Sequence, residues 1–426
     1  MRLTTAGLKG NSGHSGAQRM GAVGLAVTAA VGLAACSSKS STPSAGAGTT
    51  SAAGAATSAA GSSAAGSSAA GSSAAGSSAA GSSAASSGTG ASAAASTGGG
   101  STGKRVGVAL ILKTLSNPYF VSMEKDAKAA AAKDNVALTV AAGSKDGDTS
   151  TQIAAIENAI SRGDKGILIT TNGDAVNTSL TKAKAAGLFV IALDTSTNPP
   201  SVADITYATD NQAAGKLDGQ YAAAALGGKP AVIAMLDLFN NQVVSVDIQR
   251  DHGFLEGMGI NPGSTTQNGK EAKTGKYSGG TYTIACHNPT QGAIDGGRTA
   301  MENCLSKNPN INVVYAINEP AGEGGYNALK AAGKASQAMI FAIDGSCAGL
   351  KFVTSGEFAS DATQYPGKMA SLGVDGIARL ARGGAKPAVT NGKTFFDTGT
   401  ALVATKPVAG VTIQSPAAAA ASCWGS

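Results

Sequence analysis

Val106-Gly107-Val108-Ala109-Leu110-Ile111-Leu112 is an uninterrupted apolar stretch, the pattern of a strand that is buried on both faces of a parallel sheet. A helical pattern from Phe120 to about Asp134 follows it, and a second strand pattern covers Ala137–Ala142. Strand, helix and strand alternate with short connections, which is typical of a parallel β-α-β unit. The stretch therefore predicts an α/β protein.

The same alternation continues along the chain and then starts again. In the first half it predicts a helix over Thr149–Arg162, a strand over Gly166–Thr170, a helix beginning near Asp174 and a strand over Leu188–Leu193. In the second half it predicts strands over Ala231–Leu236, Thr281–Ala285, Asn312–Ala316 and Met339–Ile343, each followed by a helix. Gly259–Gly280 has no periodicity and is predicted to be a surface loop. Two similar half-chains predict two Rossmann-like lobes that face each other across a cleft.

The charge of the chain is concentrated at its beginning. The formal net charge is +6, from 32 Lys and Arg residues against 26 Asp and Glu residues. Four of the basic residues and none of the acidic ones lie in residues 1–103. The rest of the chain is close to neutral, so no nucleic-acid partner is predicted.

Residues 1–35 have the pattern of a secretory signal. Basic residues precede an apolar stretch over Gly21–Leu33, which is too short to span a bilayer comfortably. The stretch ends in Leu33-Ala34-Ala35-Cys36, which resembles the lipobox of bacterial lipoproteins and implies that Cys36 is lipidated. An ordinary signal peptide with an incidental cysteine is the alternative.

Residues 36–103 form a low-complexity segment of almost only Ala, Gly, Ser and Thr. It contains five consecutive Gly-Ser-Ser-Ala-Ala units over Gly61–Ala85. Without large apolar side chains the segment cannot offset the entropy of ordering its backbone, so we expect a disordered tether.

Polar groups cluster where the predicted strands of the two lobes end. They are Lys113, Asn117, Asp194, Thr195, Arg250, Asn318, Asp344 and Gln364, accompanied by the aromatic residues Tyr119 and Phe120. Carboxylates, amides and a guanidinium satisfy sugar hydroxyls in pairs, and aromatic rings cover the C–H faces of a sugar ring. The strand ends hold no clustered His and no Gly-rich phosphate cradle. We therefore predict no cofactor and no metal, and His252 and His287 are predicted to be structural.

These residues resemble the ribose-type periplasmic sugar-binding proteins, the extracytoplasmic receptors of ATP-driven (ABC) sugar importers. The resemblance runs from about Arg105 to the C-terminus, and its motifs are Ser116-Asn117-Pro118-Tyr119-Phe120, Leu193-Asp194, Arg250 with Gly253-Phe254, Ile317-Asn318-Glu319, Ile343-Asp344-Gly345 and Thr363-Gln364. The Arg250–Phe254 stretch, the Ile317–Pro320 stretch and the Cys423-Trp424-Gly425 ending look most like the fructose-binding members.

The resemblance implies a periplasmic binding protein type I fold, whose two lobes are joined by a three-stranded hinge. The implied N-terminal lobe comprises residues 104–209 and 365–396, and the implied C-terminal lobe comprises residues 210–364 and 397–426. The ten strand-end residues named above would bind a fructose- or ribose-like monosaccharide without chemical change. The family has Arg at the position of Thr195, an aromatic near Gly292 and a small polar residue at Lys113, which leaves the sugar open. A monomer, held outside the cytoplasm by lipidated Cys36, would deliver the sugar to a permease with ATPase subunits.

Cys286, Cys304, Cys347 and Cys423 form an even set in an exported chain, which favours disulfides with three possible pairings. Cys347–Cys423 is the preferred pair, because it would clamp the C-terminal tail and because the ending resembles that of the fructose binders. The remaining pair, Cys286 with Cys304, is left open. A strand end and the far end of the next helix lie roughly 15 Å or more apart at ~1.5 Å per residue, against the ~4.4–6.8 Å that a disulfide allows.

Two other functions remain open at this point. Ser122 with Lys125, Thr209-Asp210-Asn211 and Lys273-Thr274-Gly275 follow the order of the β-lactamase and penicillin-binding motifs. A serine acyl-transferase is nevertheless disfavoured, because Lys273 falls in the predicted loop and Thr209 at a lobe crossing. A sugar-sensing receptor subunit with the same lobes is the other alternative.

Overall fold

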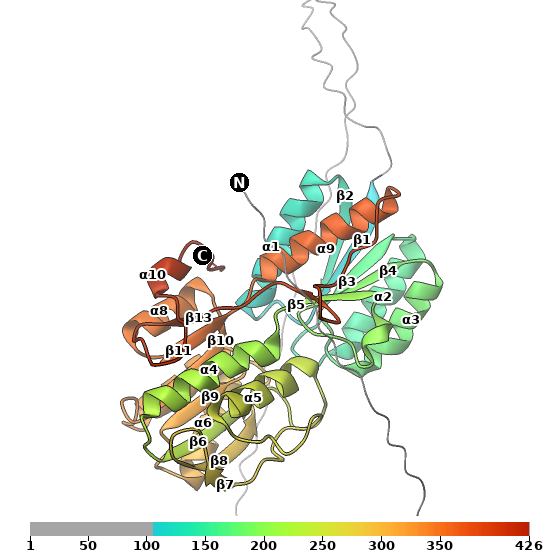
Figure 1. Ribbon diagram of the computed structural model, residues 1–426. Helices are drawn as coiled ribbons and strands as arrows, with labels where there is room; N and C mark the ends of the chain where they lie inside the picture. The colour runs from blue at the N-terminus through green and yellow to red at the C-terminus, as the bar shows by residue number, and fades with distance from the viewer. Residues whose placement is uncertain (1–104, 426) are drawn as a thin grey trace, which may run out of the picture. The chain divides into compact units, whose positions relative to one another are not determined.

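The structure is a computed structural model that describes residues 105–425. The predicted signal peptide, the lipidated Cys36 and the tether lie outside the described residues. Two sheets organise the fold (Figure 1). The first has six strands, all paired in parallel, in the order β12 (Phe396–Asp397), β5 (Ile205–Ala208), β4 (Phe189–Leu193), β3 (Gly166–Ile169), β1 (Val106–Leu112) and β2 (Val136–Ala142).

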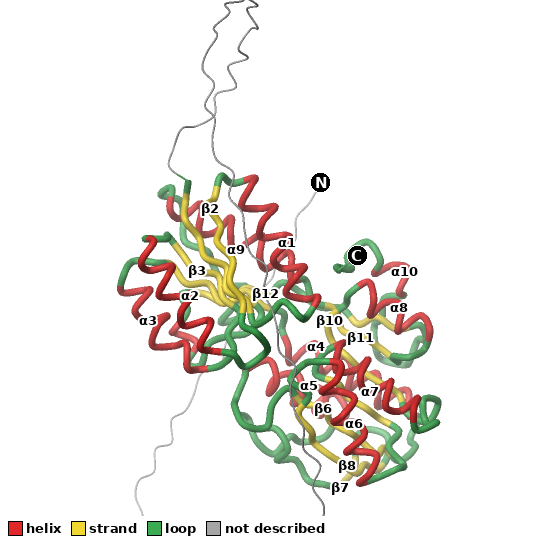
Figure 2. The backbone as a smooth tube through the Cα atoms, turned by 180° about the vertical axis from the view of Figure 1, so that it is seen from behind, coloured by secondary structure: helices red, strands yellow, loops and turns green. Residues whose placement is uncertain are grey.

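Helices cover both faces of the first sheet (Figure 2). On one face lie α1 (Pro118–Lys133) and α9 (Pro366–Ala381), and on the other α2 (Thr149–Arg162) and α3 (Asn177–Ala185). Along β1, Val108, Leu110 and Leu112 pack toward α1 and α9. Ala109 and Ile111 pack toward α2 and α3. The apolar stretch is thus buried on both sides, as its sequence predicts.

The second sheet has seven strands and is parallel in its interior. Its order is β13 (Leu402–Ala404), β11 (Ser360–Thr363), β10 (Met339–Asp344), β9 (Val313–Ala316), β6 (Ala231–Asp237), β8 (Thr281–Pro289) and β7 (Thr274–Lys276). Only the two edge pairs, β13 with β11 and β7 with β8, are antiparallel. The chain passes between the sheets three times: after β5, after β11 and after β12.

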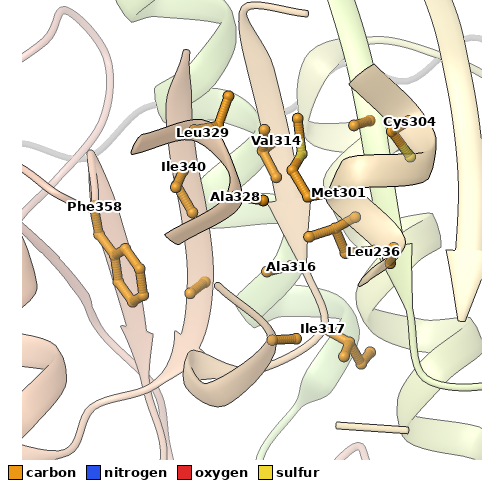
Figure 3. Close-up of a cluster of buried hydrophobic side chains, with 14 of the residues drawn as sticks. Leu236, Met301, Cys304, Val314, Ala316, Ile317, Ala328, Leu329, Ile340 and Phe358 are labelled. Carbon is orange, nitrogen blue, oxygen red and sulfur yellow. The ribbon is translucent and has the colours of Figure 1, made fainter. Parts of the chain in front are cut away.

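The second sheet is also covered on both faces. One face carries α4 (Asn211–Leu226) and α5 (Ser245–Met258). The other carries α6 (Ile294–Lys307), α7 (Glu319–Ala331) and α8 (Cys347–Ser355). Met301 of α6 and Leu329 of α7 pack on Val314 of β9 (Figure 3). A short helix, α10 (Pro416–Ala419), packs beside α8 near the C-terminus. The doubly covered parallel sheets confirm the predicted α/β class. No helix within residues 105–425 is both long and apolar enough to cross a membrane.

The prediction of a featureless loop over Gly259–Gly280 was wrong in its second half. Residues 274–276 form β7, which pairs with the beginning of β8. The amide of Tyr277 then donates to the carbonyl of Gly280, which closes the turn, and the Tyr277 side chain is buried. The segment escaped detection because an edge strand with three exposed residues has no buried face to create a periodic pattern.

Both disulfides of the structure lie on the second lobe. Cys347–Cys423 has a Cα–Cα distance of 4.9 Å, and this preferred pair is confirmed. Cys286–Cys304 is also present, with a Cα–Cα distance of 5.6 Å, so the predicted separation was wrong. Cys286 lies within β8 rather than at its end, because the strand continues to Pro289. Helix α6 returns along the strand and brings Cys304 back to the level of Cys286.

Helices α4 and α5 approach each other through glycines. A Cβ atom on Gly215 would collide with the carbonyl oxygen of Arg250, and one on Gly219 would collide with that of Phe254. Gly253 of α5 faces the carbonyl of Gln212 in the same way. Because backbone meets backbone at these positions, a methyl group has no flexible neighbour to displace. The contact fixes the position of α5.

Substituting Gly219→Ala should therefore separate α4 from α5 and destabilise the protein by about 1–3 kcal/mol, the usual cost of overpacking. Urea unfolding of the purified protein measures this change. Gln220→Ala, at an exposed position of the same helix, is the matched control and should leave the midpoint unchanged. Equal stability of Gly219→Ala and the wild type would contradict the close contact.

Candidate functional site

Residues from the carboxyl ends of both sheets enclose one small cavity of about 30 Å³. Every predicted site residue except Thr195 lines it: Lys113, Asn117, Tyr119, Phe120, Asp194, Arg250, Asn318, Asp344 and Gln364. All nine are buried. The cavity thus brings together residues as far apart in the sequence as Lys113 and Gln364.

The first lobe positions its cavity residues through strand ends and a helix cap. Lys113 directly follows β1, and Asn117 caps α1 by accepting a hydrogen bond from the amide of Tyr119 at 2.9 Å. This cap aims the first turn of α1, with Tyr119 and Phe120, into the cavity. Asp194 follows β4 with φ of 64°, a conformation that Asp tolerates better than most residues.

The second lobe holds Arg250 by hydrogen bonds within the lobe. Its Nε donates to Oδ1 of Asn211 at 2.7 Å, and its Nη1 donates to the carbonyl of Ile317 at 2.8 Å. Asn318 caps α7 by accepting from the amide of Ala321 at 3.0 Å, and its amide group donates to the carbonyl of Gly292. The guanidinium and the amide are therefore held in place by the protein itself.

Asp344 ends β10 and is the central acceptor on the second lobe. Gln364 Nε2 donates to its Oδ1 at 2.8 Å, and the amide of Glu319 donates to its Oδ2 at 3.3 Å. Burial raises the pKa of Asp344 well above its usual range, and the nearby Glu319 carboxylate raises it further, while Arg250 opposes both effects. The carboxyl group is therefore poised to gain from any additional hydrogen-bond donor in the cavity.

Asp194 joins the charges of the two lobes. Its Oδ2 lies 3.7 Å from Nζ of Lys113 in the first lobe, and its Oδ1 lies 3.7 Å from Nη2 of Arg250 in the second. The hydroxyl of Tyr119 donates to Asp194 Oδ1 at 3.1 Å and lies 3.4 Å from Oε1 of Gln364. Burial and the carboxylates of Asp194 and Asp344 raise the pKa of Tyr119, so the phenol stays a neutral donor. These contacts link the lobes across the cavity.

Thr195 does not line this cavity. Its hydroxyl donates to Asp194 Oδ2 at 2.7 Å, and the residue lines a separate pocket. The residue therefore orients the Asp194 carboxylate instead of facing the cavity. The position of Gly292 is also restricted: a Cβ atom there would lie 3.0 Å from Asn318 Nδ2 and 3.1 Å from Asp146 Oδ2, which leaves no room for the aromatic ring of the ribose binders in this conformation.

Four cavity residues were missed from the sequence: Asp146, Leu238, Val246 and Ile317. Asp146 had a usable signal, because it follows the predicted strand Ala137–Ala142 as the other polar groups follow theirs. Its Oδ1 is buried without a hydrogen-bond partner. Leu238 and Val246 carried no signal, since an isolated Leu or Val looks like ordinary core, and Ile317 belonged to a motif but was not predicted to line the site.

The C-terminal tail supports the cavity from behind. The indole of Trp424 donates to the carbonyl of Asp344 at 3.0 Å, and its ring packs edge-on against Tyr119 at 5.2 Å between centroids. The Cys347–Cys423 disulfide holds the tail directly beside this tryptophan. The tail thus contacts residues of both lobes that line the cavity.

The fold and the cavity define a two-lobed ligand-binding protein of the periplasmic type. Residues 108–385 match the model of the periplasmic binding protein domain, and the chain belongs to that family. Members of this family bind and deliver solutes, so the chain is a binding protein and not an enzyme.

Relatives with assigned ligands share the same organisation. The chain is 27% identical to the ribose import binding protein of Escherichia coli over 277 residues, which cover 65% of this chain and 85% of the relative. A solute-binding protein of Agrobacterium vitis solved with D-fucose is 25% identical with a TM-score of 0.58, and the match covers 70% of this chain and 95% of that one. A second protein of that organism, solved with α-D-tagatopyranose, has 20% identity and a TM-score of 0.61, covering 75% and 99%.

The acyl-transferase alternative was wrong. Ser122 is buried on α1 beside the first sheet, whereas Thr274 and Gly275 form part of β7 at the outer edge of the second sheet. A serine nucleophile and a K-T-G strand must be neighbours, and here they belong to different lobes.

The carboxyl group of half-buried Asp146, whose Oδ1 atom is buried without a hydrogen-bond partner, predicts a pH effect on stability. Burial raises its pKa to about 6, an increase that Lys113 opposes and Asp194 supports. The folded protein thus binds this proton more tightly than the unfolded chain, whose Asp pKa is ~3.9. Stability relative to Asp146→Asn should therefore fall by on the order of 2 kcal/mol as the pH rises from 4 to 7.

Urea unfolding of the wild type and of Asp146→Asn at several pH values between 4 and 7 measures the difference in their free energies of unfolding. Lys145→Gln, which alters the exposed neighbouring residue, should follow the wild-type profile. Parallel profiles for the wild type and Asp146→Asn would show that the carboxyl group is hydrated in solution.

Proposed function

We propose that this protein captures a monosaccharide, fructose or a ribose-like sugar, and delivers it to an ABC importer. The observation that carries the proposal is the convergence of carboxylate, amide, guanidinium and aromatic groups from both lobes on one buried cavity. Each sugar hydroxyl both donates and accepts, and this set offers donors in Arg250 and Asn318 and acceptors in Asp194 and Asp344.

Binding in this site requires the lobes to separate and close again. A cavity of about 30 Å³ holds one or two water molecules, and a sugar needs more room. The contacts that now link the lobes, Asp194 with Arg250 and Tyr119 with Gln364, involve the groups that a sugar would bridge. A sugar that satisfies both sets of groups favours the closed state through contacts that the open state lacks.

Two sources support the class of sugar. The ribose import binding protein of Escherichia coli covers most of the globular part of this chain. The Arg250–Phe254, Ile317–Pro320 and Cys423–Gly425 stretches resemble the fructose-binding members. Thr195 and Gly292, where the ribose binders have larger groups, leave the identity of the sugar within this class open.

The cellular arrangement is part of the same proposal. Residues 1–35 are a lipoprotein signal peptide, Cys36 carries the lipid, and residues 36–103 are a tether. The N-terminal lobe comprises residues 104–209 and 365–396, and the C-terminal lobe residues 210–364 and 397–426. The protein acts outside the cytoplasm as a monomer that meets the permease and ATPase subunits of its importer.

Calorimetric titration with fructose, ribose, xylose, glucose, galactose and inositol identifies the ligand and tests the proposal. For the sugar that binds, Arg250→Ala and Asp344→Ala should each weaken affinity at least ~10-fold, because a charged group bonded to a buried hydroxyl contributes ~1.5–3 kcal/mol. Arg250→Ala should also lower the melting temperature, because it removes the bonds to Asn211 and Ile317.

Arg298→Ala is the matched control for these variants. Arg298 lies on α6 in an exposed ion pair with Glu302, so its loss should change neither affinity nor stability noticeably. Circular dichroism establishes that each variant is folded. The sugar proposal fails if no sugar of the panel binds, and the assigned site fails if folded Arg250→Ala and Asp344→Ala both keep the wild-type affinity.

Replacing Cys36→Ser should release the protein from membranes, because acyl chains on Cys36 provide the attachment in this proposal. A single acyl chain binds only marginally, so the two or three chains of a lipoprotein are needed for stable anchoring. Cell fractionation followed by immunoblotting measures the distribution. A Cys36→Ser protein that stays in the membrane fraction would indicate an uncleaved signal segment instead.

A further inference from the structure

A second cluster of titratable side chains lies on the second lobe, outside the cavity described above. Asp237 ends β6, Asp251 lies on α5 and His287 lies on β8. One oxygen or nitrogen atom from each lies within 4.8 Å of the others. The sequence showed no metal-ligand spacing around His287, because the three residues come from separate elements. Only the pairing of β6 with β8 and the packing of α5 on the second sheet bring them together.

The imidazole of His287 is held between two carboxylates. Its Nδ1 lies 2.9 Å from Oδ2 and 3.1 Å from Oδ1 of Asp237, and its Nε2 lies 2.9 Å from Oε1 of Glu271. In protein metal sites, one ring nitrogen of a ligating histidine commonly faces the ion while the other donates to a carboxylate. Glu271 is placed for that supporting role.

Asp251 accepts no hydrogen bond from a donor group of the protein, and only a proton shared with the adjacent Asp237 carboxyl group would connect it to a neighbour. The residue is 1% exposed, and neither carboxylate oxygen forms a hydrogen bond to the protein. A buried carboxylate is normally paired, hydrogen-bonded or bound to a metal. Its neighbour in the cluster, Asp247, differs in this respect, because it accepts hydrogen bonds from the amides of Leu238 and Phe239.

The cluster also has a surplus of acidic groups. Asp237, Asp247, Asp251 and Glu271 lie together, and the basic groups around them are His287, Arg250, His252 near Glu271 and Lys270 in the adjoining cavity. Arg250 is committed to Asn211 and the carbonyl of Ile317. An additional positive charge would therefore stabilise the cluster.

A path to the surface exists. A cavity of about 420 Å³ is lined by Asp237, Asp247 and His287 together with Asn268, whose side-chain amide is buried without a hydrogen-bond partner. An ion can therefore reach Asp237 and His287 from this side, whereas Asp251 does not line the cavity and Lys270 does.

We propose that Asp237, Asp251 and Nδ1 of His287 bind a divalent transition-metal ion such as Zn²⁺ or Mn²⁺, with Glu271 accepting the Nε2–H hydrogen bond. One imidazole nitrogen with two carboxylate oxygens suits these ions better than Ca²⁺ or Mg²⁺, which prefer oxygen ligands throughout. The ion would connect β6, α5, β8 and, through Glu271, the segment before β7. Since Arg250 is the neighbour of Asp251 on α5, the site would hold the helix that carries the cavity guanidinium.

Metal content of the purified full chain tests the proposal. After EDTA treatment, the protein is dialysed against Zn²⁺, Mn²⁺ or Ca²⁺, and bound metal is measured by mass spectrometry. We expect one equivalent of Zn²⁺ or Mn²⁺ per chain and at least a tenfold loss of affinity in Asp251→Asn. Asp218→Asn is the matched control, because Asp218 is an equally buried carboxylate of the same lobe that accepts from Ser360.

The competing arrangement is a metal-free network in which His287 is protonated and Asp251 shares a proton with Asp237. Burial lowers the pKa of His287, but Asp237 and Glu271 together raise it to about 10. Absence of stoichiometric metal in the wild type, or equal binding by folded Asp251→Asn, would overturn the proposal in favour of this network. Should Asp251→Asn fail to fold, Co²⁺ titration of the wild type decides: visible absorption bands that Zn²⁺ displaces support the site, and their absence overturns it.

Discussion

Parallel strands that are buried on both faces impose the constraint on which this molecule depends. Their two faces must be covered by helices, and every connection that follows a strand then emerges at the same edge of the sheet. In β1 the alternation is visible residue by residue, with Leu110 packed toward α1 and Ile111 toward α2. The two sheets direct these edges to one cavity, and this is why polar residues far apart in the sequence meet there.

The cavity brings opposite charges together both within the first lobe and between the two lobes. Asp194 of the first lobe has a cation from each side, Lys113 from its own lobe and Arg250 from the other. Arg250 is in turn positioned by Asn211 and by α5, whose place is set by backbone contact with the glycines of α4. A methyl group added to a glycine of the α4–α5 contact would therefore shift the Arg250 guanidinium. A change of charge in the cavity would act on the same group.

Supporting elements extend this dependence to distant parts of the chain. The disulfide at Cys423 places Trp424 against Tyr119 and against the backbone of Asp344, so the tail braces both lobes. On α5 itself, the carboxylate of Asp251 lies in the acidic cluster with His287. The helix that presents Arg250 to the cavity is thus supported by glycine contacts on one side and by polar groups on another.

The sequence by itself determined the α/β class, most strands and nine of the cavity residues, because strands buried on both faces and the polar groups that follow them leave local patterns. It also favoured Cys347–Cys423. Only the tertiary structure decided the rest: the strand at residues 274–276, the Cys286–Cys304 pair, the turning of Thr195 away from the cavity and the meeting of Asp237, Asp251 and His287. The physical reason is common to these cases. Each case depends on how far a strand continues or on which elements become neighbours. Packing between distant segments decides both, and the sequence of one segment does not show which other segment it will pack against.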